Sequence, residues 1–388
     1  MRNKWIKVVF PLLAALLLVT WLGVFADDND TMIGQEVLQA EVTQALVPPS
    51  QSASESAEDA VLSSQEQADY VSDASNQLSD SEPVSITPSI VPDDSYFDKQ
   101  WALGKIQALE AWQVTSGSQD VLIAILDTGI DQNHEDLKGK VMAEVNFTDS
   151  PTPDDIHGHG THIAGIIAAN SNNGTGIAGV ASEVRLMNVK VADDKGRCQA
   201  SAVADGIIWA VDSGAGVINI SIELREPSLQ LEDAVNYAWS QGAIIIAAAG
   251  NDGSQSPIYP AYYENCIAVA ATRQNDTLAP LSNYGDWVNV AAPGFNIYST
   301  LPDDGYGYKT GTSFAAPYVS GLAALLFSVV TDTNDDGRLN DEVRTAIETG
   351  AQELNISGVG CGRINALKAV RKAVESLPAI EAGEITTI

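Results

Sequence analysis

Three residues, far apart in the chain, have the side chains that acyl transfer by a serine requires. They are Asp127, His159 and Ser313, each flanked by glycine or threonine. A serine hydroxyl is a weak nucleophile until a base takes its proton, and an imidazole does this best when a buried carboxylate fixes its tautomer. The three residue types therefore predict a nucleophile, a base and an acid that orients the base.

Each of these residues also has a purely structural interpretation. Ser313 follows Gly311 and Thr312, a place typical of a helix N-cap. Asp127 precedes Gly129, a place typical of a turn. A serine that caps a helix can also act as a nucleophile, so the two interpretations of Ser313 do not exclude each other.

The segments around these residues have the pattern of a parallel sheet covered by helices. Aliphatic runs suited to strands buried on both faces lie at 121–126, 184–191, 216–222 and 242–249. Helical patterns fall between them at 161–169, 200–212 and 229–240, and further helices are expected at 313–329, 341–348 and 364–376. This alternation predicts a single α/β domain with a doubly wound parallel sheet and helices on both faces.

The same arrangement predicts where the reactive side chains meet. In open α/β sheets, ligands bind outside the carboxyl ends of the strands. Asp127 closes the first aliphatic run, Asn251 follows the fourth, and His159 and Ser313 each stand at the start of a helix. We therefore expect all four residues on one rim of one sheet.

The charge distribution excludes some functions and divides the chain. The 388 residues carry a net charge of −31, which argues against binding to nucleic acid or to an anionic membrane surface. Residues 27–95 contain 15 acids and no lysine or arginine. We predict an acidic, disordered linker or pro-segment at 27–93, a catalytic domain at 94–378 and a short tail at 379–388.

The N-terminus has the features of an export segment. Three basic residues precede a nearly unbroken apolar run from Val8 to Ala26, which ends in small residues suited to signal cleavage. The run is also long enough to span a bilayer. Residues 1–26 are therefore either a signal peptide or a retained membrane anchor. Both predict an exported protein that is secreted, periplasmic or anchored outside the cytoplasmic membrane.

The chain has three cysteines, Cys198, Cys266 and Cys361, in no metal-binding spacing. They can form one disulfide and one free thiol, or stay unpaired.

Beyond the reactive residues, several segments resemble one known family. Residues from about 94 to 373 are similar to the subtilisin-like (subtilase) serine proteases, closest to the thermitase-like members. The segments that carry the resemblance are 105–108, 125–129, 159–162, 176–179, 234–239, 247–251, 311–317 and 362–366. The chain order Asp, His, Ser is itself typical of subtilisin, so it forms part of the resemblance. The resemblance implies a monomeric serine endopeptidase that acts on extended peptides or unfolded proteins.

The resemblance also implies a role for each reactive residue. Ser313 would attack the peptide, His159 would take its proton and later pass it to the leaving amine, and Asp127 would stabilise the imidazolium. The Asn251 amide and the Ser313 N–H would face the developing oxyanion. Asn251 as a left-handed turn residue is the alternative.

The peptide groove is expected between segments 196–199 and 221–223, with Gly250 beside it. The family usually has glycines where this chain has Cys198 and Glu223. Cys198 would lie on the side of the groove that contains Gly196, and Glu223 on the side that contains Ser221. Glu223, together with Asp252, could favour a basic substrate side chain. The alternative is a solvated acid at the edge of the pocket.

Calcium is the cofactor that the resemblance implies. The segment 170–177 is similar to a calcium loop of the family, with carboxylate, amide and carbonyl oxygens that suit a hard cation. The implied ligands are Asp94, Asp136, Asn170, Asn173, Thr175 and Ile177. An Asn/Gly-rich turn that binds nothing is the alternative.

A second calcium candidate begins like an EF-hand loop, with Asp332, Asn334 and Asp336. Position 12 of that motif is Val343, and Glu342 falls one place early. The alternative is an acidic loop that connects two helices. A metal site is a competing interpretation of the histidines at 157, 159 and 162, but no H-E-x-x-H zinc motif accompanies them.

Two competing functions remain open from the sequence. One is a membrane-tethered processing protease with a dedicated target, and the other is an inactive peptide binder that keeps the groove. The complete set of Asp127, His159, Ser313 and Asn251 argues against the inactive binder. We expect activity to rise with pH between about 6.5 and 7.5 as His159 becomes neutral.

Overall fold

The computed structural model describes residues 91–375. The predicted export segment, the acidic segment up to residue 90 and the tail lie outside the described residues. In the described part, a parallel sheet has the strand order β2-β3-β1-β4-β5-β6-β7. Its strands are β1 (Leu122–Asp127), β2 (Val141–Asn146), β3 (Arg185–Lys190), β4 (Val217–Ile220), β5 (Ile244–Ala248), β6 (Cys266–Thr272) and β7 (Val290–Pro293). The predicted doubly wound α/β sheet is confirmed.

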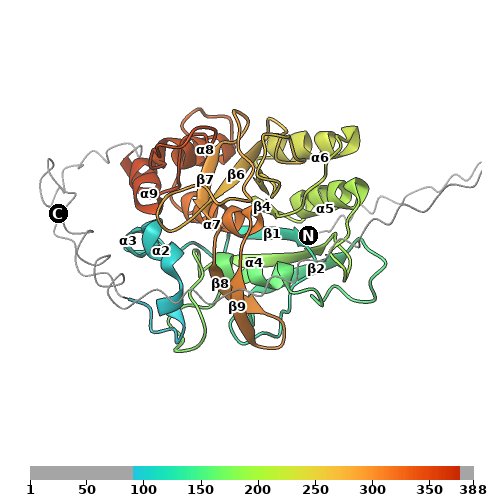
Figure 1. Ribbon diagram of the computed structural model, residues 1–388, viewed down its shortest axis with the longest axis horizontal. Helices are drawn as coiled ribbons and strands as arrows, with labels where there is room; N and C mark the ends of the chain where they lie inside the picture. Colours follow the sequence, from blue (N-terminus) through green and yellow to red (C-terminus); the bar gives the residue numbers. More distant parts are fainter. Residues whose placement is uncertain (1–90, 376–388) are drawn as a thin grey trace, which may run out of the picture. The chain divides into compact units, whose positions relative to one another are not determined.

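Strand β1 shows why both faces of the sheet are covered. Ile123 and Ile125 join an apolar cluster with α4 (His159–Ala168) and α7 (Thr312–Phe327). The alternate residues Ala124 and Leu126 join a second cluster with α5 (Ala200–Asp212) and α6 (Leu229–Ser240). Successive side chains of a strand point to opposite faces, so a continuous aliphatic strand requires helices on both sides. In Figure 1, α5 and α6 lie together, apart from α4 and α7.

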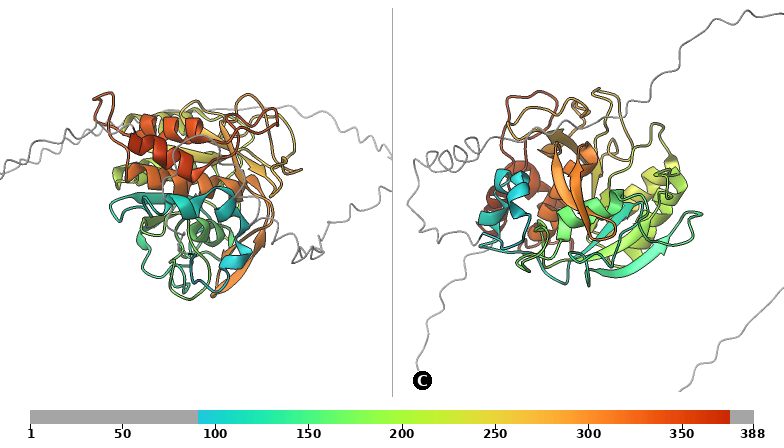
Figure 2. Two further views of the ribbon diagram at one scale, coloured as in Figure 1. Left: turned by 90° about the vertical axis from the view of Figure 1, so that its left-hand side faces the viewer. Right: turned by 60° about the horizontal axis from the view of Figure 1, so that its bottom comes forward.

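Smaller elements complete the described part. An antiparallel hairpin of β8 (Ile297–Leu301) and β9 (Gly305–Lys309) packs on α4, as Figure 2 shows in orange beside the green helix. Helices α8 (Asn340–Gly350) and α9 (Ala366–Glu375) pack together beside α7. Three short helices, η1 (Phe97–Lys99), α2 (Trp101–Lys105) and α3 (Ala108–Ala111), precede the sheet.

Helix α4 begins at His159, two residues before the expected start at Thr161. The Asp155 carboxylate accepts hydrogen bonds from the backbone N–H groups of Gly158 and Thr161, both at 2.8 Å. These donors belong to the first turn, which has no partners within the helix. The carboxylate therefore extends the helix to the histidine, and His159 sits on a rigid first turn.

Strand β2 was not predicted, because it is an edge strand whose residues alternate between half-buried and exposed. The sequence pattern also misses strands β6 and β7, since about half of their residues are alanines and each has at most two larger aliphatic side chains. The three cysteines are unpaired, and Cys266 is buried in the core. Between residues 91 and 375, no helix is long and apolar enough to span a membrane.

Candidate active site

The carboxyl rim of the sheet brings Asp127 and His159 into direct contact. His159 Nδ1 donates to Asp127 Oδ1 at 2.7 Å, and the Thr128 N–H donates to the same oxygen at 2.8 Å. Asp127 is 1% exposed, whereas the His159 side chain keeps 19% of its surface open. The imidazole is therefore held on its inner side by a buried acid and is accessible on its outer side.

Glycine at position 160 allows this contact. A Cβ atom at Gly160 would lie 2.1 Å from the backbone oxygen of Gly129 and 3.1 Å from Cβ of Asp127. Any side chain there would push α4 away from the end of β1. The Gly160 N–H also donates to Thr128 Oγ1 at 3.1 Å, which joins the helix to the residue after the acid.

The environment of His159 favours its protonated form. Burial lowers the pKa of His159. The attraction of the Asp127 carboxylate and the hydrogen bond to it together raise the pKa by more than burial lowers it, so the pKa lies above its ordinary value. Lys309 also lowers the pKa and Asp155 also raises it. Such an imidazole readily accepts a proton, which is the property required of a general base.

Ser313 lies on the same rim, in the first turn of α7. Its neighbour Phe314 contacts the His159 ring, with 5.3 Å between the ring centroids. The Ser313 Oγ donates to the backbone oxygen of Ser221 at 3.4 Å, a long hydrogen bond, and no hydrogen bond to His159 is present in this arrangement. Catalytic hydrogen bonds are often long or absent until substrate binds. The serine and the imidazole thus share the rim but do not yet bond.

Asn251 is oriented by the residue before the serine. Its Oδ1 accepts from the backbone N–H of Thr312 at 2.8 Å and from the Thr312 hydroxyl at 3.2 Å. These two donors identify the oxygen of the amide, so the NH₂ group points the other way. That group donates to Glu223 Oε1 at 2.5 Å. The amide donor therefore lies beside the N-terminus of α7, where the helix dipole also favours negative charge.

The predicted groove residues lie on two segments, of which the one with Gly196 is close to His157 and the one with Ser221 contacts Ser313. Gly196 has φ of +73°, and Gly250 has φ of +101°. A Cβ atom at Gly250 would lie 2.6 Å from Nδ2 of Asn283. Cys198 pairs with Ala192 in an isolated antiparallel bridge, and burial raises the pKa of its thiol to about 11. The Ser221 hydroxyl donates to the backbone oxygen of Ser313 at 2.9 Å, which ties one edge of the groove to the rim.

The two acids near the groove have different partners. Asp252 forms a bidentate ion pair with Arg225, with distances of 2.7 and 3.0 Å. Its charge is therefore already matched. Glu223 is bonded to the neutral amide of Asn251 and forms no such pair. Of the two residues named for a basic substrate side chain, only Asp252 forms an ion pair with Arg225, whereas Glu223 interacts with the same guanidinium at longer range.

The candidate calcium loop surrounds two buried acids. Asp94 is 5% exposed and accepts from the backbone N–H groups of Asn172 and Asn173. Asp136 is 0% exposed and accepts from the Asn173 amide, the Ile177 N–H and the Tyr306 hydroxyl. Burial raises the pKa of the Asp136 carboxyl. Neither acid has a lysine or arginine partner among the ion pairs of residues 91–375, so the pair fits a hard cation.

The other predicted ligands hold the shape of this loop. The Asn170 N–H donates to the backbone oxygen of Asp136 at 2.8 Å, and the Thr175 N–H donates to Asn173 Oδ1 at 2.7 Å. No group of three or more His, Cys, Asp or Glu side chains that could hold a metal occurs in the described residues. A cation here would depend on amide and backbone oxygens for most of its ligands.

The second candidate loop fits a cation less well. The carboxylate of Asp332 accepts from the backbone N–H groups of Asn334, Asp336 and Gly337. Asp336 forms an ion pair with Arg338 at 2.6 Å, so an internal cation already matches this acid. Buried oxygens of Asp341 and Glu342 lack partners and lie just beyond the loop.

The other two histidines of the cluster do not form a metal site with His159. His157 is exposed. His162 is buried against Phe314, with 4.7 Å between ring centroids, and its Nε2 lies 3.1 Å from the backbone oxygen of Gly307. Burial lowers the pKa of His162 to about 3, so it is neutral at physiological pH. It is a core residue of α4.

Several residues that build the site were not singled out from the sequence. Thr128 and Thr312 bond to Asp127 and Asn251, and Asp155 caps the helix that carries His159. Lys190 is a charged residue at the end of a buried strand, and that position in an aliphatic run is a signal that could have identified it.

Comparison with known families and proteins identifies close relatives. A profile described as the subtilase family matches residues 118–362. Thermitase from Thermoactinomyces vulgaris is 48% identical over 286 residues, which cover 72% of this chain and 99% of thermitase. A thermophilic serine proteinase from a Bacillus species is 48% identical over 285 residues, which cover 72% of this chain and 69% of that protein.

Solved structures give the same picture. A protease from Pseudoalteromonas arctica superposes with a TM-score of 0.66 at 31% sequence identity. The match covers 73% of this chain and the whole of the other chain.

Proposed function

The chain belongs to the subtilase family of serine proteases, and on that premise we propose that it is an exported endopeptidase that cleaves peptide bonds through an acyl-enzyme on Ser313. The observation that carries this proposal is the 2.7 Å contact between Asp127 and His159, beside the first turn of α7 that holds Ser313. Acid, base and alcohol come from three distant segments of the chain. Their presence on one rim has a simple explanation in acyl transfer.

The residues divide the reaction between them. Ser313 releases the Ser221 carbonyl and attacks the scissile carbon while His159 takes its proton. Asp127 keeps the imidazole in the tautomer with the proton on Nδ1 and stabilises the imidazolium that forms. His159 then protonates the leaving amine, which leaves an ester on Ser313. Water hydrolyses the ester with His159 again as the base.

The oxyanion is stabilised by the Asn251 amide and the backbone N–H of Ser313. The Thr312 contacts hold the amide in this orientation before substrate arrives, so little reorganisation is needed during the reaction. Glu223 must first give up its hydrogen bond to Asn251. Loss of one such donor costs about 10²–10³ in turnover, a magnitude measured in subtilisin, a member of this family.

An extended peptide or an unfolded segment of a protein is the proposed substrate. It would add as a strand between segments 196–199 and 221–223, where main-chain hydrogen bonds supply affinity. The half-buried Cys198 narrows one side, and Glu223 places a carboxylate on the other. We propose that Glu223 gives a modest preference for a basic side chain beside the scissile bond. A panel of peptides without any gain for arginine or lysine would contradict this.

Calcium bound by the 170–177 loop is part of the proposal. Asp94 and Asp136 would supply charge, and the oxygens of Asn170, Asn173, Thr175 and Ile177 would complete the shell. The ion would stabilise the fold and take no part in the chemical step. Because Arg338 already matches Asp336, we expect a smaller contribution from Asp332, Asn334 and Asp336.

Labelling with a fluorophosphonate tests the proposal directly. The reagent forms a covalent bond with an activated serine, so the wild-type protein should be labelled and Ser313→Ala should not. Repeating the labelling after calcium chelation and mild heating tests the proposed role of the ion. Wild-type protein that is folded, saturated with calcium and neither labelled nor proteolytic would overturn the proposed function.

A tethered protease with a dedicated target is the second candidate, and the apolar run from Val8 to Ala26 favours it. N-terminal sequencing of the exported protein separates the two. A retained N-terminus indicates a tether, and a new N-terminus after Ala26 indicates secretion. In either case we propose a monomer.

A further inference from the structure

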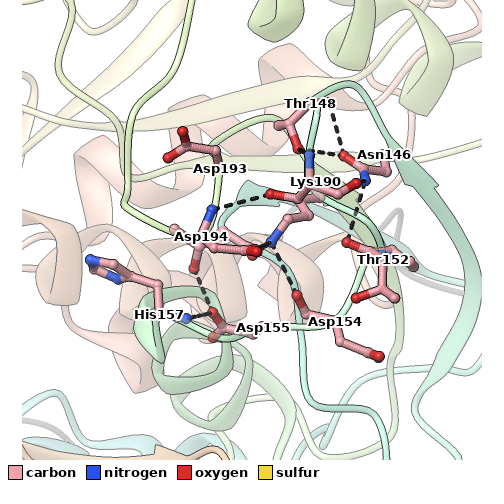
Figure 3. A network of polar contacts seen from close by, with 12 residues as sticks. Asn146, Thr148, Thr152, Asp154, Asp155, His157, Lys190, Asp193 and Asp194 are labelled. Atoms are coloured by element: carbon pink, nitrogen blue, oxygen red, sulfur yellow. Dashed lines mark hydrogen bonds and ion pairs between the residues drawn. The ribbon is translucent and has the colours of Figure 1, made fainter.

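A fully buried lysine lies behind the reactive rim. Lys190 is the last residue of β3 and is 0% exposed. Its Nζ donates to the backbone oxygen of Thr128 at 2.5 Å and to that of Asp154 at 3.0 Å, and it forms an ion pair with Asp194 at 2.8 Å. Figure 3 shows the ammonium between Asp154 and Asp194, with Asp155 and His157 nearby.

These partners satisfy the ammonium completely. A lysine ammonium has three donors and no acceptor, and here three acceptors surround it. Burying a charge is costly unless it is paired and hydrogen-bonded, and Asp194 supplies the opposite charge. Such a group holds its neighbours firmly, because none of them can move away without leaving a buried donor unpaired.

Each acceptor belongs to a different part of the site. Thr128 follows Asp127, and the two strands run side by side with Asp127 opposite Lys190. Asp154 precedes Asp155, the carboxylate that caps the helix of His159 and also accepts from the Thr128 hydroxyl at 2.8 Å. Asp194 lies in the loop that leads to Gly196 and Cys198, one edge of the proposed groove.

We propose that Lys190 is a positioning residue that ties the Asp127–His159 pair to the substrate-binding edge. This inference rests on the proposed function of the same site. Lys190 touches neither substrate nor the reacting atoms. Its contacts with two backbone carbonyls keep the acid and the base in position relative to each other. Its contact with one carboxylate holds the 193–198 loop.

The two kinds of contact predict two separable effects. The contacts to Thr128 and Asp154 support the chemical step, because displacement of a catalytic group by about 1 Å can reduce turnover by on the order of 10². The contact to Asp194 supports binding of the peptide. Loss of the whole ammonium should therefore lower kcat and raise KM, whereas loss of Asp194 alone should raise KM.

The midpoint of the pH profile of kcat/KM is a further readout, because a general loss of stability would not shift it. The charged groups facing His159 are Asp127 from β1, Asp155 from the preceding loop and Lys309 from β9, and His157 and His162 lie close on its own segment. Of these, Asp127 chiefly holds the His159 pKa up. A looser Asp127–His159 contact should lower the midpoint of the kcat/KM profile towards that of free histidine.

The experiment compares Lys190→Met, Asp194→Asn and Lys140→Met in the calcium-loaded protein. Lys140 is the matched control, since its half-buried Nζ also donates to a backbone oxygen, that of Ser182, but lies at the opposite end of the sheet. Active sites are counted with the fluorophosphonate. Then kcat, KM, the pH midpoint and Tm are measured on one peptide substrate.

We expect Lys190→Met to lower kcat by about 10–100-fold and to lower the pH midpoint. Asp194→Asn should raise KM by about 3–10-fold with kcat and midpoint unchanged, a loss on the scale of one ordinary hydrogen bond, because the amide oxygen can still accept from the ammonium. Lys140→Met should lower Tm alone.

Two results would overturn the inference. One is a Lys190→Met protein that loses as much Tm as Lys140→Met but keeps kcat, KM and midpoint. The other is an Asp194→Asn protein with wild-type KM, and this variant decides the matter if Lys190→Met does not fold. Failure of the proposed function itself would look different, because the wild type would then show neither labelling nor turnover.

Discussion

Two buried aspartates, Asp127 and Asp136, lie nine positions apart and have opposite electrostatic surroundings. Asp127 contacts an imidazole that can carry a positive charge. Asp136 accepts only from an amide, a backbone N–H and a phenol, all neutral, and burial raises its pKa. Both carboxylates are desolvated, but among the ion pairs of residues 91–375 only Asp127 has a basic side chain in direct contact.

The different surroundings favour a chemical role for Asp127 and a cation-binding role for Asp136. A buried carboxylate needs a compensating charge, from the protein or from solution. At Asp127 the compensating charge appears when His159 takes a proton, so it can arise during a reaction. At Asp136 the proposed compensating charge is a bound cation, which would be permanent and structural. The proposed chemical and calcium sites follow from this contrast.

The largest expected effect that tests the contrast comes from Asp127→Asn. The amide keeps the size but loses the charge and disturbs the His159 tautomer, so turnover should fall by about 10⁴-fold. Calcium dependence of Tm should stay as in the wild type. Kinetics and thermal unfolding with and without calcium measure both. A variant that loses calcium dependence and keeps turnover would reverse the two assignments.

The second effect is the pH dependence of kcat/KM. His159 must be neutral to act as a base, so below the midpoint the rate should fall roughly tenfold per pH unit. Because the pKa of His159 is raised, the midpoint should lie above that of free histidine. A pH-independent rate across this range would remove His159 as the base.

The same pKa shift predicts that stability changes with pH in the opposite direction to activity. A raised folded pKa means that protonated His159 stabilises the fold. That contribution is complete below the unfolded pKa and is lost as pH rises through the folded pKa. In the pH range around the folded pKa of His159, activity should therefore rise while this contribution to the free energy of unfolding is lost. Urea unfolding at several pH values measures the loss of stability.

The third effect concerns Asp136→Asn. Calcium at about a thousand times its Kd stabilises a fold by about 4 kcal/mol, which in a domain of this size raises Tm by on the order of 10 °C. The variant should lose most of this gain and keep turnover per active site at low temperature. Asp98→Asn, an exposed acid nearby, is the control and should keep the gain. Equal calcium responses in both variants would place the ion elsewhere.

The smallest effect is expected from Glu223→Gln. This substitution keeps the hydrogen bond to Asn251 and removes the charge, so any preference for arginine or lysine substrates should fall by at most about fivefold. Glu226→Gln, an exposed acid of the same segment, should leave the preference unchanged. Peptides that differ only beside the scissile bond measure the ratio. A preference unchanged by Glu223→Gln would identify it as a solvated edge acid.

Helix bounds were predicted well where the helix is amphipathic and has clear ends. The observed α5 and α6 match the expected 200–212 and 229–240, and Ser228 caps α6 by accepting from the Leu231 N–H. Helix α4 was misplaced at its start because its cap, Asp155, is four residues upstream of His159. A cap formed across such a turn leaves no regular spacing in the sequence.

The contacts of the candidate site were less predictable than its members. Pairing of Asp252 with Arg225, and of Glu223 with the Asn251 amide, depends on how two loops meet. Lys190 was part of a run expected to form a buried strand, but its three acceptors come from residues 128, 154 and 194. Sequence spacing does not indicate which carbonyl and carboxylate oxygens face the ammonium.

The sequence alone determined the class of fold, the order of the reactive residues and their placement at the ends of strands and the starts of helices. Those properties follow from local periodicity and from side-chain chemistry, which each short segment carries by itself. Only the tertiary structure decided which buried charges of residues 91–375 have an oppositely charged partner and which do not, since this depends on distances between segments far apart in the sequence.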